Sequence, residues 1–425
     1  MDAQEPAAAD GRAARGGTVR GEAVRGEAVR GEAVRGEAVR GEAVRGGAAG
    51  AGPARPGLSG EPGPHPLVCF SHLRWNFVYQ RPQHLMTRFA RSAPVLFVEE
   101  PVFAAGAPPS LAVAETAEGV AVAVPRLPPD LDEAGRTAAL RRLLDRLCAA
   151  RGIVAPILWY YTPMALGFSD HLRPALTVYD CMDELAAFRG APAALQAREE
   201  ELLRRADLVF TGGHSLYEAK RGRHPRVYPF PSGVDAAHFR RARAALPEPA
   251  DLAAIPRPRI GHYAVLDERL DTALLAAVAD ARPDWQLVLI GPTAKIDPGE
   301  LPRRPNIHYL GGRDYQELPA YLAGWDMAMM PFALNAATRF ISPTKTPEYL
   351  AAGKPVVSTP VADVVRSFGG SGLVRIAGTP AAFVAAVEQS LRELPPSAAW
   401  LDEVDRVLSA MSWDATWAGM KALIG

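Results

Sequence analysis

A lysine and a glutamate one helical turn apart mark one segment as a candidate site for a phosphorylated nucleoside. Lys345 and Glu348 lie in TKTPEYLAAGKPVV, where Pro343 and Pro347 fit a helix start and Gly353 fits its end. Free N–H groups at a helix N-terminus attract phosphate, and Lys345 adds a positive charge. Glu348 could accept hydrogen bonds from ribose hydroxyls. The alternative is that Glu348 only complements the helix dipole and that Lys345 is solvated.

Three carboxyl groups crowd the end of a second apolar run, LTVYD. They belong to Asp180, Asp183 and Glu184. Repulsion among them would raise the pKa of one in a partly buried site, which suits a general base. Group transfer to a hydroxyl needs such a base. We expect Asp183 to fill this role, with Asp180 as the second candidate; the alternative is that these acids cap the following helix.

The end of the first apolar run, LVCF, supplies candidates for the other substrate. Ser71 and His72 follow this run directly, and Arg74 and Arg81 come shortly after. His72 could act as a base or contact a sugar, and a structural role is the alternative. The two arginines could bind an acceptor or a phosphate, or remain solvated at the surface.

These candidates all follow short apolar runs that alternate with amphipathic stretches. The alternation begins at Pro66 and restarts after the Ala-, Pro- and Arg-rich stretch 240–259, which predicts two doubly wound α/β domains in tandem. Ligands bind beyond the carboxyl ends of parallel strands. We therefore expect the candidate residues to meet in a cleft between the domains.

The first 65 residues have a different composition. Residues 21–45 repeat the pentad GEAVR five times, and no aromatic residue precedes Phe70. A period of five fits neither a helix nor a strand, and there is little apolar surface to bury. The sequence predicts a disordered low-complexity tail, with a docking arm as the alternative.

Composition restricts the class of protein further. The 425 residues carry 47 basic and 47 acidic side chains, so net charge offers no attraction to nucleic acid. Three separated cysteines and the lack of a Cys/His cluster indicate neither disulfides nor a metal site. No apolar run approaches a membrane span, and no signal peptide is visible. We expect a cytoplasmic protein whose contact with the membrane, if it has one, is peripheral at the inner face.

Several segments together resemble a known family. The stretch 348–357 (EYLAAGKPVV) is similar to the nucleotide-sugar donor motif of group 1 glycosyltransferases of the GT-B fold. PSGVD at 231–235, with Phe239, resembles the family's segment before the interdomain linker. The stretches 70–85 and 179–188 resemble bacterial cell-surface polysaccharide and teichuronic-acid-type transferases. The resemblance covers roughly residues 67–425.

The resemblance implies transfer of a sugar from a nucleotide diphosphate, with UDP expected, to a glycan or lipid-linked acceptor. It implies no cofactor, no metal and no nucleic acid partner. A nucleotide-sugar epimerase and a non-catalytic nucleotide-sugar-binding relative are the alternatives. The expected organisation is a tail (1–65), an acceptor-side domain (66–240), a linker (241–258), a donor domain (259–410) and a C-terminal helix that packs back on the first domain (411–425).

Two departures from the family pattern affect the donor site. Phe340 stands where many members have a first Glu, and a GR…K pair falls on Ala264 and Arg269, so half of the usual diphosphate clamp is missing. We therefore assign the diphosphate to Lys345, Arg269 and the helix N-terminus. Gly291, Gly311 and Gly312 end strands on the donor side, where their backbone could contact the donor; the alternative is that they are simple turn glycines. The full set of expected donor-binding residues is Arg269, Gly291, Gly311, Arg313, Thr344, Lys345 and Glu348.

Overall fold

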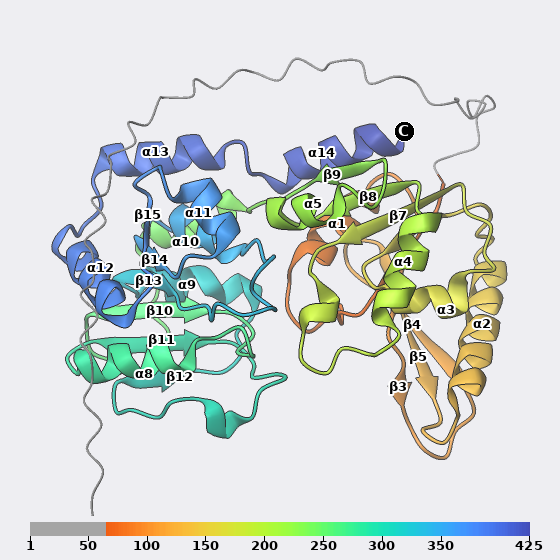
Figure 1. The fold of residues 1–425 in the computed structure, drawn as a ribbon, viewed down its shortest axis with the longest axis horizontal. Helices are drawn as coiled ribbons and strands as arrows, with labels where there is room; N and C mark the ends of the chain where they lie inside the picture. The colour runs from red at the N-terminus through yellow and green to blue at the C-terminus, as the bar shows by residue number, and fades with distance from the viewer. Residues whose placement is uncertain (1–64) are drawn as a thin grey trace, which may run out of the picture. The chain divides into compact units, whose positions relative to one another are not determined.

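The computed structural model describes residues 65–425, which contain two β-sheets flanked by helices (Figure 1). These residues confirm the predicted α/β class with two doubly wound sheets. The predicted tail lies outside the described residues except for its last one, so disorder there stays a prediction.

The first sheet has nine strands within the described part of the chain, in the order β3-β5-β2-β1-β6-β7-β8-β9, with β4 added on β5. Every pairing is parallel except β4 with β5. The order reverses at β1, which lies between β2 and β6. The strands are β1 (Leu67–Ser71), β2 (Val95–Glu99), β3 (Val102–Phe103), β4 (Ser110–Glu115), β5 (Val120–Leu127), β6 (Ile157–Tyr160), β7 (Leu176–Cys181), β8 (Leu208–Thr211) and β9 (Val227–Pro229).

The second sheet is wholly parallel and has the order β12-β11-β10-β13-β14-β15. Its strand order also reverses, between β10 and β13. Parallel α/β sheets bind ligands at such a reversal. The strands are β10 (Arg259–Tyr263), β11 (Gln286–Ile290), β12 (Ile307–Tyr309), β13 (Met327–Met330), β14 (Val356–Ser358) and β15 (Val374–Ile376).

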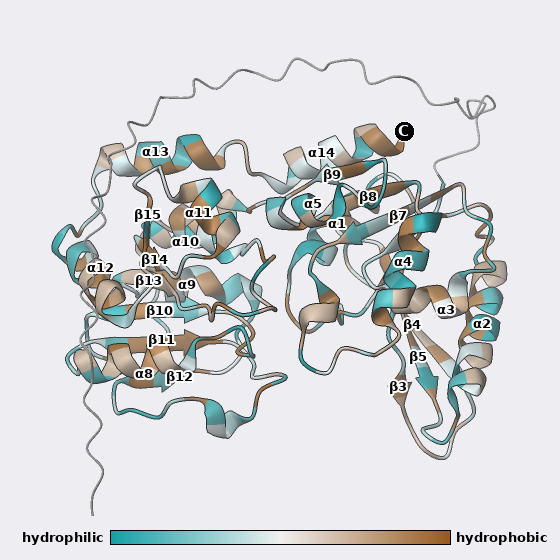
Figure 2. Cartoon of the chain, viewed as in Figure 1, coloured by the Kyte–Doolittle hydropathy of each residue, from teal (hydrophilic) through white to brown (hydrophobic). Residues whose placement is uncertain are grey.

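Helices cover both sheets, and hydrophilic and hydrophobic residues alternate along most of them (Figure 2). With the first sheet are α1 (Arg81–Phe89), α2 (Glu133–Ala150), η1 (Pro163–Ala165), α3 (Leu166–Ser169), η2 (Leu185–Ala187), α4 (Leu195–Arg205) and α5 (His214–Lys220). The rest are α6 (Ala236–Arg240), η3 (Arg241–Arg243), α7 (Ala250–Ala253), α8 (Thr272–Ala281), η4 (Pro298–Glu300), η5 (Tyr315–Glu317), α9 (Leu318–Ala323), α10 (Lys345–Ala351), α11 (Ala362–Phe368), α12 (Pro380–Arg392), α13 (Ala398–Leu408) and α14 (Trp413–Ile424).

The central strands of both sheets are buried because they are covered on both faces, whereas β4 at an edge is largely exposed. In each of β1, β2 and β10, all five residues are buried. Val234 and Phe239 already belong to the core beside the second sheet, as do Leu252 and Ile255 farther along. We call residues 65–230 together with α14 the first lobe, and residues 234–411 the second lobe.

The last helix, α14, packs on α1 of the first lobe. Trp413 is 2% exposed and stacks on His84 with a ring-centroid distance of 4.4 Å. Trp417 meets Phe89 edge to face. Asp414 pairs with an arginine of α1 from an exposed position. Apolar contact rather than charge therefore holds α14 in place, because exposed ion pairs contribute little.

Trp413→Ala should lower the free energy of unfolding by about 3–5 kcal/mol, since it empties a buried aromatic site. Asp414→Asn, one residue along the same helix, is the matched control and should change the urea midpoint far less. Urea unfolding followed by circular dichroism measures both. Equal effects would contradict the packing described here.

Candidate functional site

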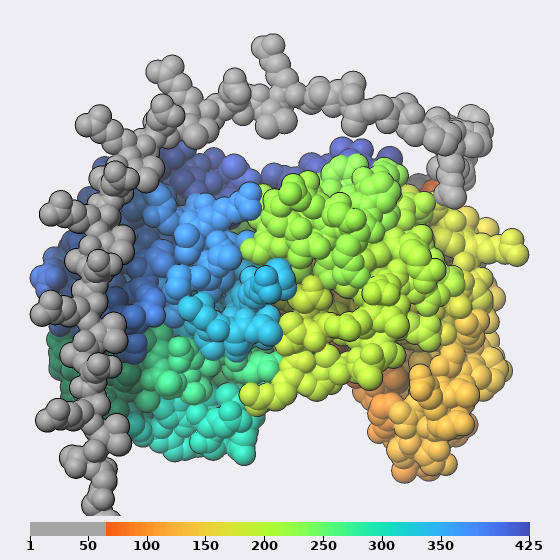
Figure 3. Space-filling model, viewed as in Figure 1, coloured from red at the N-terminus to blue at the C-terminus, as the bar shows by residue number. Residues whose placement is uncertain are grey.

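A cavity of about 1060 Å³ is lined by residues of both lobes. The first lobe contributes the loop 74–81, parts of β4 and β5, and Asp183. The second lobe contributes the ends of β10 and β11 and the loop 341–345. Figure 3 shows one face along which the second lobe (teal to blue) meets the first (orange to green). The cavity therefore lies where strand ends of both sheets meet.

Eight of the expected site residues line this cavity and five do not. The eight are Arg74, Arg81, Asp183, Arg269, Gly291, Arg313, Thr344 and Lys345. The other five are Ser71, His72, Asp180, Gly311 and Glu348, which lie outside this lining.

Glu348 lies directly behind two residues that are close to the cavity. The Tyr263 hydroxyl donates to Glu348 Oε2, and Lys345 Nζ lies 3.1 Å from the same oxygen. Lys345 Nζ also lies 4.9 Å from the centroid of the Tyr263 ring. Burial raises the pKa of Tyr263 well above its usual range, and the charge of Glu348 adds to this. Tyr263 is therefore a neutral hydrogen-bond donor.

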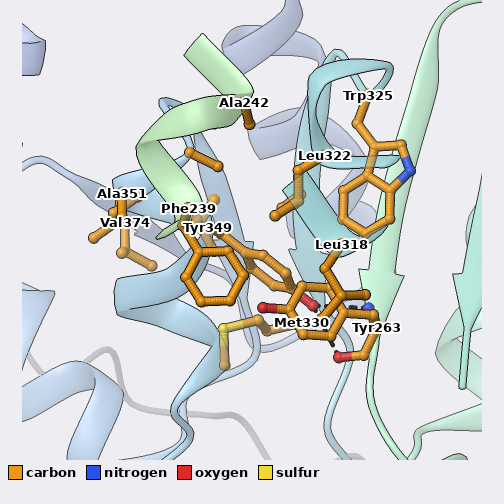
Figure 4. Packing of buried hydrophobic residues seen from close by; sticks show 14 of the residues in the cluster. Phe239, Ala242, Tyr263, Leu318, Leu322, Trp325, Met330, Tyr349, Ala351 and Val374 are labelled. Atoms are coloured by element: carbon orange, nitrogen blue, oxygen red, sulfur yellow. Dashed lines mark hydrogen bonds between the residues drawn. The ribbon is translucent and has the colours of Figure 1, made fainter. Parts of the chain in front are cut away.

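Helix α10 also holds the backbone of Tyr263. The Tyr263 N–H donates to the Tyr349 hydroxyl at 2.8 Å, and this hydroxyl lies 3.2 Å from the Tyr263 carbonyl oxygen. Figure 4 shows both rings packed beside Phe239 and Met330. The sequence analysis missed Tyr263, although its position at the end of the strand RIGHY was a usable signal.

Arg269 is a second cation on the second-lobe side of the cavity. Its guanidinium pairs with Asp267 at 2.7 Å and lies 5.5 Å from the centroid of the Phe188 ring, which belongs to the first lobe. Burial alone would lower the pKa of Arg269, but the hydrogen bond and charge of Asp267 raise it. Arg269 therefore stays charged.

Asp183 is the one member of the acidic triplet that lines the cavity. Burial raises its pKa to about 6; Arg269, Arg81 and Lys295 oppose this rise, and Asp267 adds to it. A base with a pKa near the working pH is well suited to proton transfer.

The predicted cause of this rise, repulsion by Asp180 and Glu184, is wrong, because burial of Asp183 is the main cause. Asp180 is fully buried and paired with Arg81 at 2.8 Å, and Glu184 is paired with Lys220 at 2.7 Å.

The first-lobe arginines are held by local partners. Arg81 Nη1 donates to the carbonyl oxygen of Phe230 at 2.8 Å, in addition to its pair with Asp180. Arg74 pairs with Glu99 at 3.0 Å. Ser71 is buried, and its hydroxyl accepts from a nearby backbone N–H. The two arginines line the cavity but bring little unpaired charge to it, and Ser71 lies behind the lining.

His72 is neutral near pH 7 in this structure. Burial lowers its pKa to about 4, and the charge of Lys295 contributes. Its Nδ1 is buried and has no hydrogen-bond partner among residues 65–425. Lys295 comes from the second lobe, after β11, and has a positive φ of 56°. The sequence analysis did not use Lys295, although it is one of only five lysines in the chain.

The glycines that follow β11 and β12 allow a close approach of the backbone. Gly291 has a φ of +145°, and a Cβ there would lie 1.7 Å from the Ala264 carbonyl oxygen. Its N–H donates to the Gly311 carbonyl at 2.8 Å. Arg313 pairs with Asp251 beside this turn. The close approach accounts for Gly291, and a φ of +73° accounts for Gly311, so both are explained as turn residues.

Two further features bear on the possible chemistry. The residues in the range 65–425 include no group of three or more His, Cys, Asp or Glu placed to bind a metal ion. Over the same range, no helix is both long and apolar enough to cross a membrane.

The family comparison matches the second lobe. Residues 259–393 match the family model described as "Glycosyl transferases group 1". TuaH of Bacillus subtilis (strain 168), provisionally named as a teichuronic acid biosynthesis glycosyltransferase, is 28% identical over 221 residues. This match covers 48% of the chain and 55% of TuaH, so it spans about half of either protein.

Solved structures share the fold over most of the chain. Sucrose-phosphate synthase from Thermosynechococcus elongatus has a TM-score of 0.60 at 16% identity, over 85% of this chain and 98% of its own. A UDP-forming trehalose-phosphate synthase from Burkholderia xenovorans has a TM-score of 0.62 at 13% identity, over 84% and 98%. Anabaena HepE, solved with UDP and glucose, has a TM-score of 0.58 at 14% identity, over 84% and 98%. The predicted GT-B arrangement is confirmed at the level of the fold.

Gly291→Ala should unfold or strongly destabilise the second lobe, because the added Cβ meets backbone rather than a flexible side chain. Gly370→Ala is the matched control, since nothing lies within 4 Å of a Cβ at that position. Thermal unfolding of the two variants tests this. A wild-type midpoint for Gly291→Ala would contradict the close approach.

Proposed function

Residues 259–393 match the family model of group 1 glycosyltransferases, and from this match we propose that the protein transfers a sugar from a nucleotide diphosphate donor to a hydroxyl group. The proposed donor is a UDP-sugar, and the proposed acceptor is a glycan or lipid-linked glycan of the cell surface. The name of TuaH supports the acceptor class. The bound UDP in the HepE structure supports the nucleotide.

One observation carries the proposal. A single cavity is lined by a carboxyl group suited to proton transfer, Asp183, and by two cations from the other lobe, Arg269 and Lys345. Sugar transfer needs both, because a hydroxyl must lose a proton while a diphosphate departs with negative charge.

The donor would lie against the second lobe. Lys345 and Arg269 would bind the diphosphate, and cations are the usual partners of phosphate oxygens. Among the described residues, both hydrogen bonds to the Glu348 carboxylate are made at Oε2. Oε1 is thus left to accept from a ribose hydroxyl. Tyr263 would hold Glu348 in this orientation.

The transfer step follows from these positions. The acceptor hydroxyl gives its proton to Asp183 as its oxygen forms the new bond to the sugar C1. The bond from C1 to the diphosphate oxygen breaks, and its electron pair leaves with the nucleotide. Lys345 and Arg269 then stabilise the added charge without needing to move, which is how preorganised groups accelerate such steps. We propose that no resident metal takes part.

Lys345→Ala should weaken UDP binding roughly 10- to 100-fold, the value of a charge-assisted hydrogen bond of about 1.5–3 kcal/mol. Glu348→Gln should weaken uridine and UDP alike, because it changes the proposed ribose contact. Lys421→Ala on α14 is the matched control. Calorimetric titration in EDTA measures all three, and unchanged affinity in the first two variants would contradict the donor site.

The rate of sugar transfer should rise with pH through about 6, because Asp183 must be ionised to accept a proton. Asp183→Asn should lower kcat by about 10²–10⁴-fold and remove this acid limb. His72→Gln should leave the limb in place, since the pKa of His72 is about 4. The rate of UDP release, followed at a series of pH values for the parent and both variants, measures this acid limb.

Stability provides the control for Asp183. Its folded-state pKa is raised, so ionisation destabilises the fold as pH rises from the ordinary Asp value through about 6. Asp183→Asn removes that cost and should be at least as stable as the parent at pH 7.5. A loss of activity with a loss of fold would contradict a catalytic role.

A further inference from the structure

A carboxylate of the second lobe caps a helix of the first. Asp363, 3% exposed on α11, accepts from the backbone N–H groups of His214 and Ser215 at 2.9 Å each. The Ser215 hydroxyl donates to it at 2.5 Å. These two residues begin α5, so the orphan N–H groups of this helix find their acceptor across the lobe boundary.

Two glycines before α5 allow segments from both walls of the cavity to approach the start of this helix closely. A Cβ on Gly213 would lie 2.3 Å from Asp363 Oδ2 and 2.6 Å from Ser342 Cβ. A Cβ on Gly212 would lie 2.8 Å from the Met182 carbonyl oxygen. Gly213 has an extended φ of −168°, so space and not backbone strain requires glycine there. Ser342 precedes the Lys345 segment, and Met182 precedes Asp183.

The other end of α5 holds the loop that carries Asp183. Lys220, 1% exposed, contacts Glu184 Oε2 and Glu199 Oε1 at 2.7 Å each. Glu184 is the next residue after Asp183. On the other side of Asp183, the Gly212 N–H donates to the Cys181 carbonyl at 2.8 Å. The loop is thus attached to both ends of α5.

We infer that α5 positions Asp183 against the donor side of the cavity, with Asp363 and Lys220 as positioning residues at its two ends. The inference rests on the proposed function for its catalytic meaning. The arrangement itself is independent of that function.

The charged groups around Asp183 explain why its position relative to the second lobe matters. Arg269 and Asp267 face it from the loop after β10, Lys295 faces it from the loop after β11, and Arg81 faces it from α1. Three of these four groups belong to the second lobe. The burial and charge environment of Asp183 therefore involve the lobe boundary at which Asp363 makes its contact.

Asp363→Asn keeps the shape of the cap but loses its charge. One carboxylate oxygen becomes an NH₂ group, which cannot accept a hydrogen bond from the N–H groups of α5. Without the cap, Asp183 should gain access to water, and its pKa should fall from about 6 toward the ordinary Asp value. The acid limb of kcat/KM should move down with it. We expect kcat to fall at least tenfold while the Kd for UDP changes less than threefold.

A direct titration separates this inference from the proposed function. Carbon NMR of the full-length protein labelled at Asp carboxyl groups, with Asp183→Asn to assign the signal, gives the pKa of Asp183 without any substrate. Gly213→Ala should lower this pKa as Asp363→Asn does, and Ser215→Ala should lower it less. Asp402→Asn, exposed on α13, is the matched control.

The Lys220 end needs a mild variant, because Lys220→Met would leave buried carboxylates unpaired and threaten folding. Glu184→Gln weakens one contact and leaves Lys220 paired with Glu199. It should lower kcat and leave the Kd for UDP unchanged.

An Asp183 pKa that stays the same in folded Asp363→Asn and Gly213→Ala would overturn the inference, whether or not sugar is transferred. A shifted pKa in a protein that neither binds UDP nor turns over would support the positioning and overturn the proposed function. A tenfold loss of kcat with no pKa shift would also count against α5 as the positioning element.

Discussion

One contact that joins the two walls of the cavity is made by the carboxylate of Asp363 at the start of α5. It accepts hydrogen bonds from two partly buried backbone N–H groups and from one hydroxyl. A hydrogen bond to a charged group contributes about 1.5–3 kcal/mol net, so separating the lobes here carries a penalty. The glycines beside it allow the contact, since any side chain at Gly213 would strike Asp363 or Ser342. Through this contact the base side and the cation side of the cavity come to face each other.

Two of the three acids at the end of β7 are paired with basic side chains, and the third is left to exchange a proton. Asp180 is paired with Arg81, and Glu184 with Lys220, in buried settings where an unpaired charge would be costly. Asp183 lies between them in sequence but faces the cavity, where burial raises its pKa to about 6. Three adjacent acids thus divide into two structural anchors and one group able to exchange a proton. This division follows from their partners and not from their residue type.

The second lobe shows the complementary arrangement for an anion. Tyr263 and Lys345 both contact one oxygen of Glu348, and Tyr349 fixes the backbone of Tyr263. Two adjacent residues of α10 therefore orient the end of β10, which puts the helix and the strand in a fixed relation. The aromatic packing in Figure 4 makes this relation rigid. A phosphate meeting Lys345 would meet a side chain that is already placed.

The amino-acid sequence by itself determined the elements and the identity of most of the groups in the cavity. Short, largely apolar runs such as QLVLI that alternate with amphipathic stretches are typical of buried parallel strands, and the residues after such strands lie at a common edge. That reasoning placed Asp183, Arg269 and Lys345 in one cleft. It ranked Asp183 before Asp180 but could not exclude Asp180, because both lie at the end of the same strand and the pairing of Asp180 with the distant Arg81 is visible only in the structure. Tertiary structure alone also decided the roles of Tyr263, Lys295 and Asp363. Each acts through a partner that is remote along the chain, and the pairing of such partners is set by how two lobes pack and not by any local pattern.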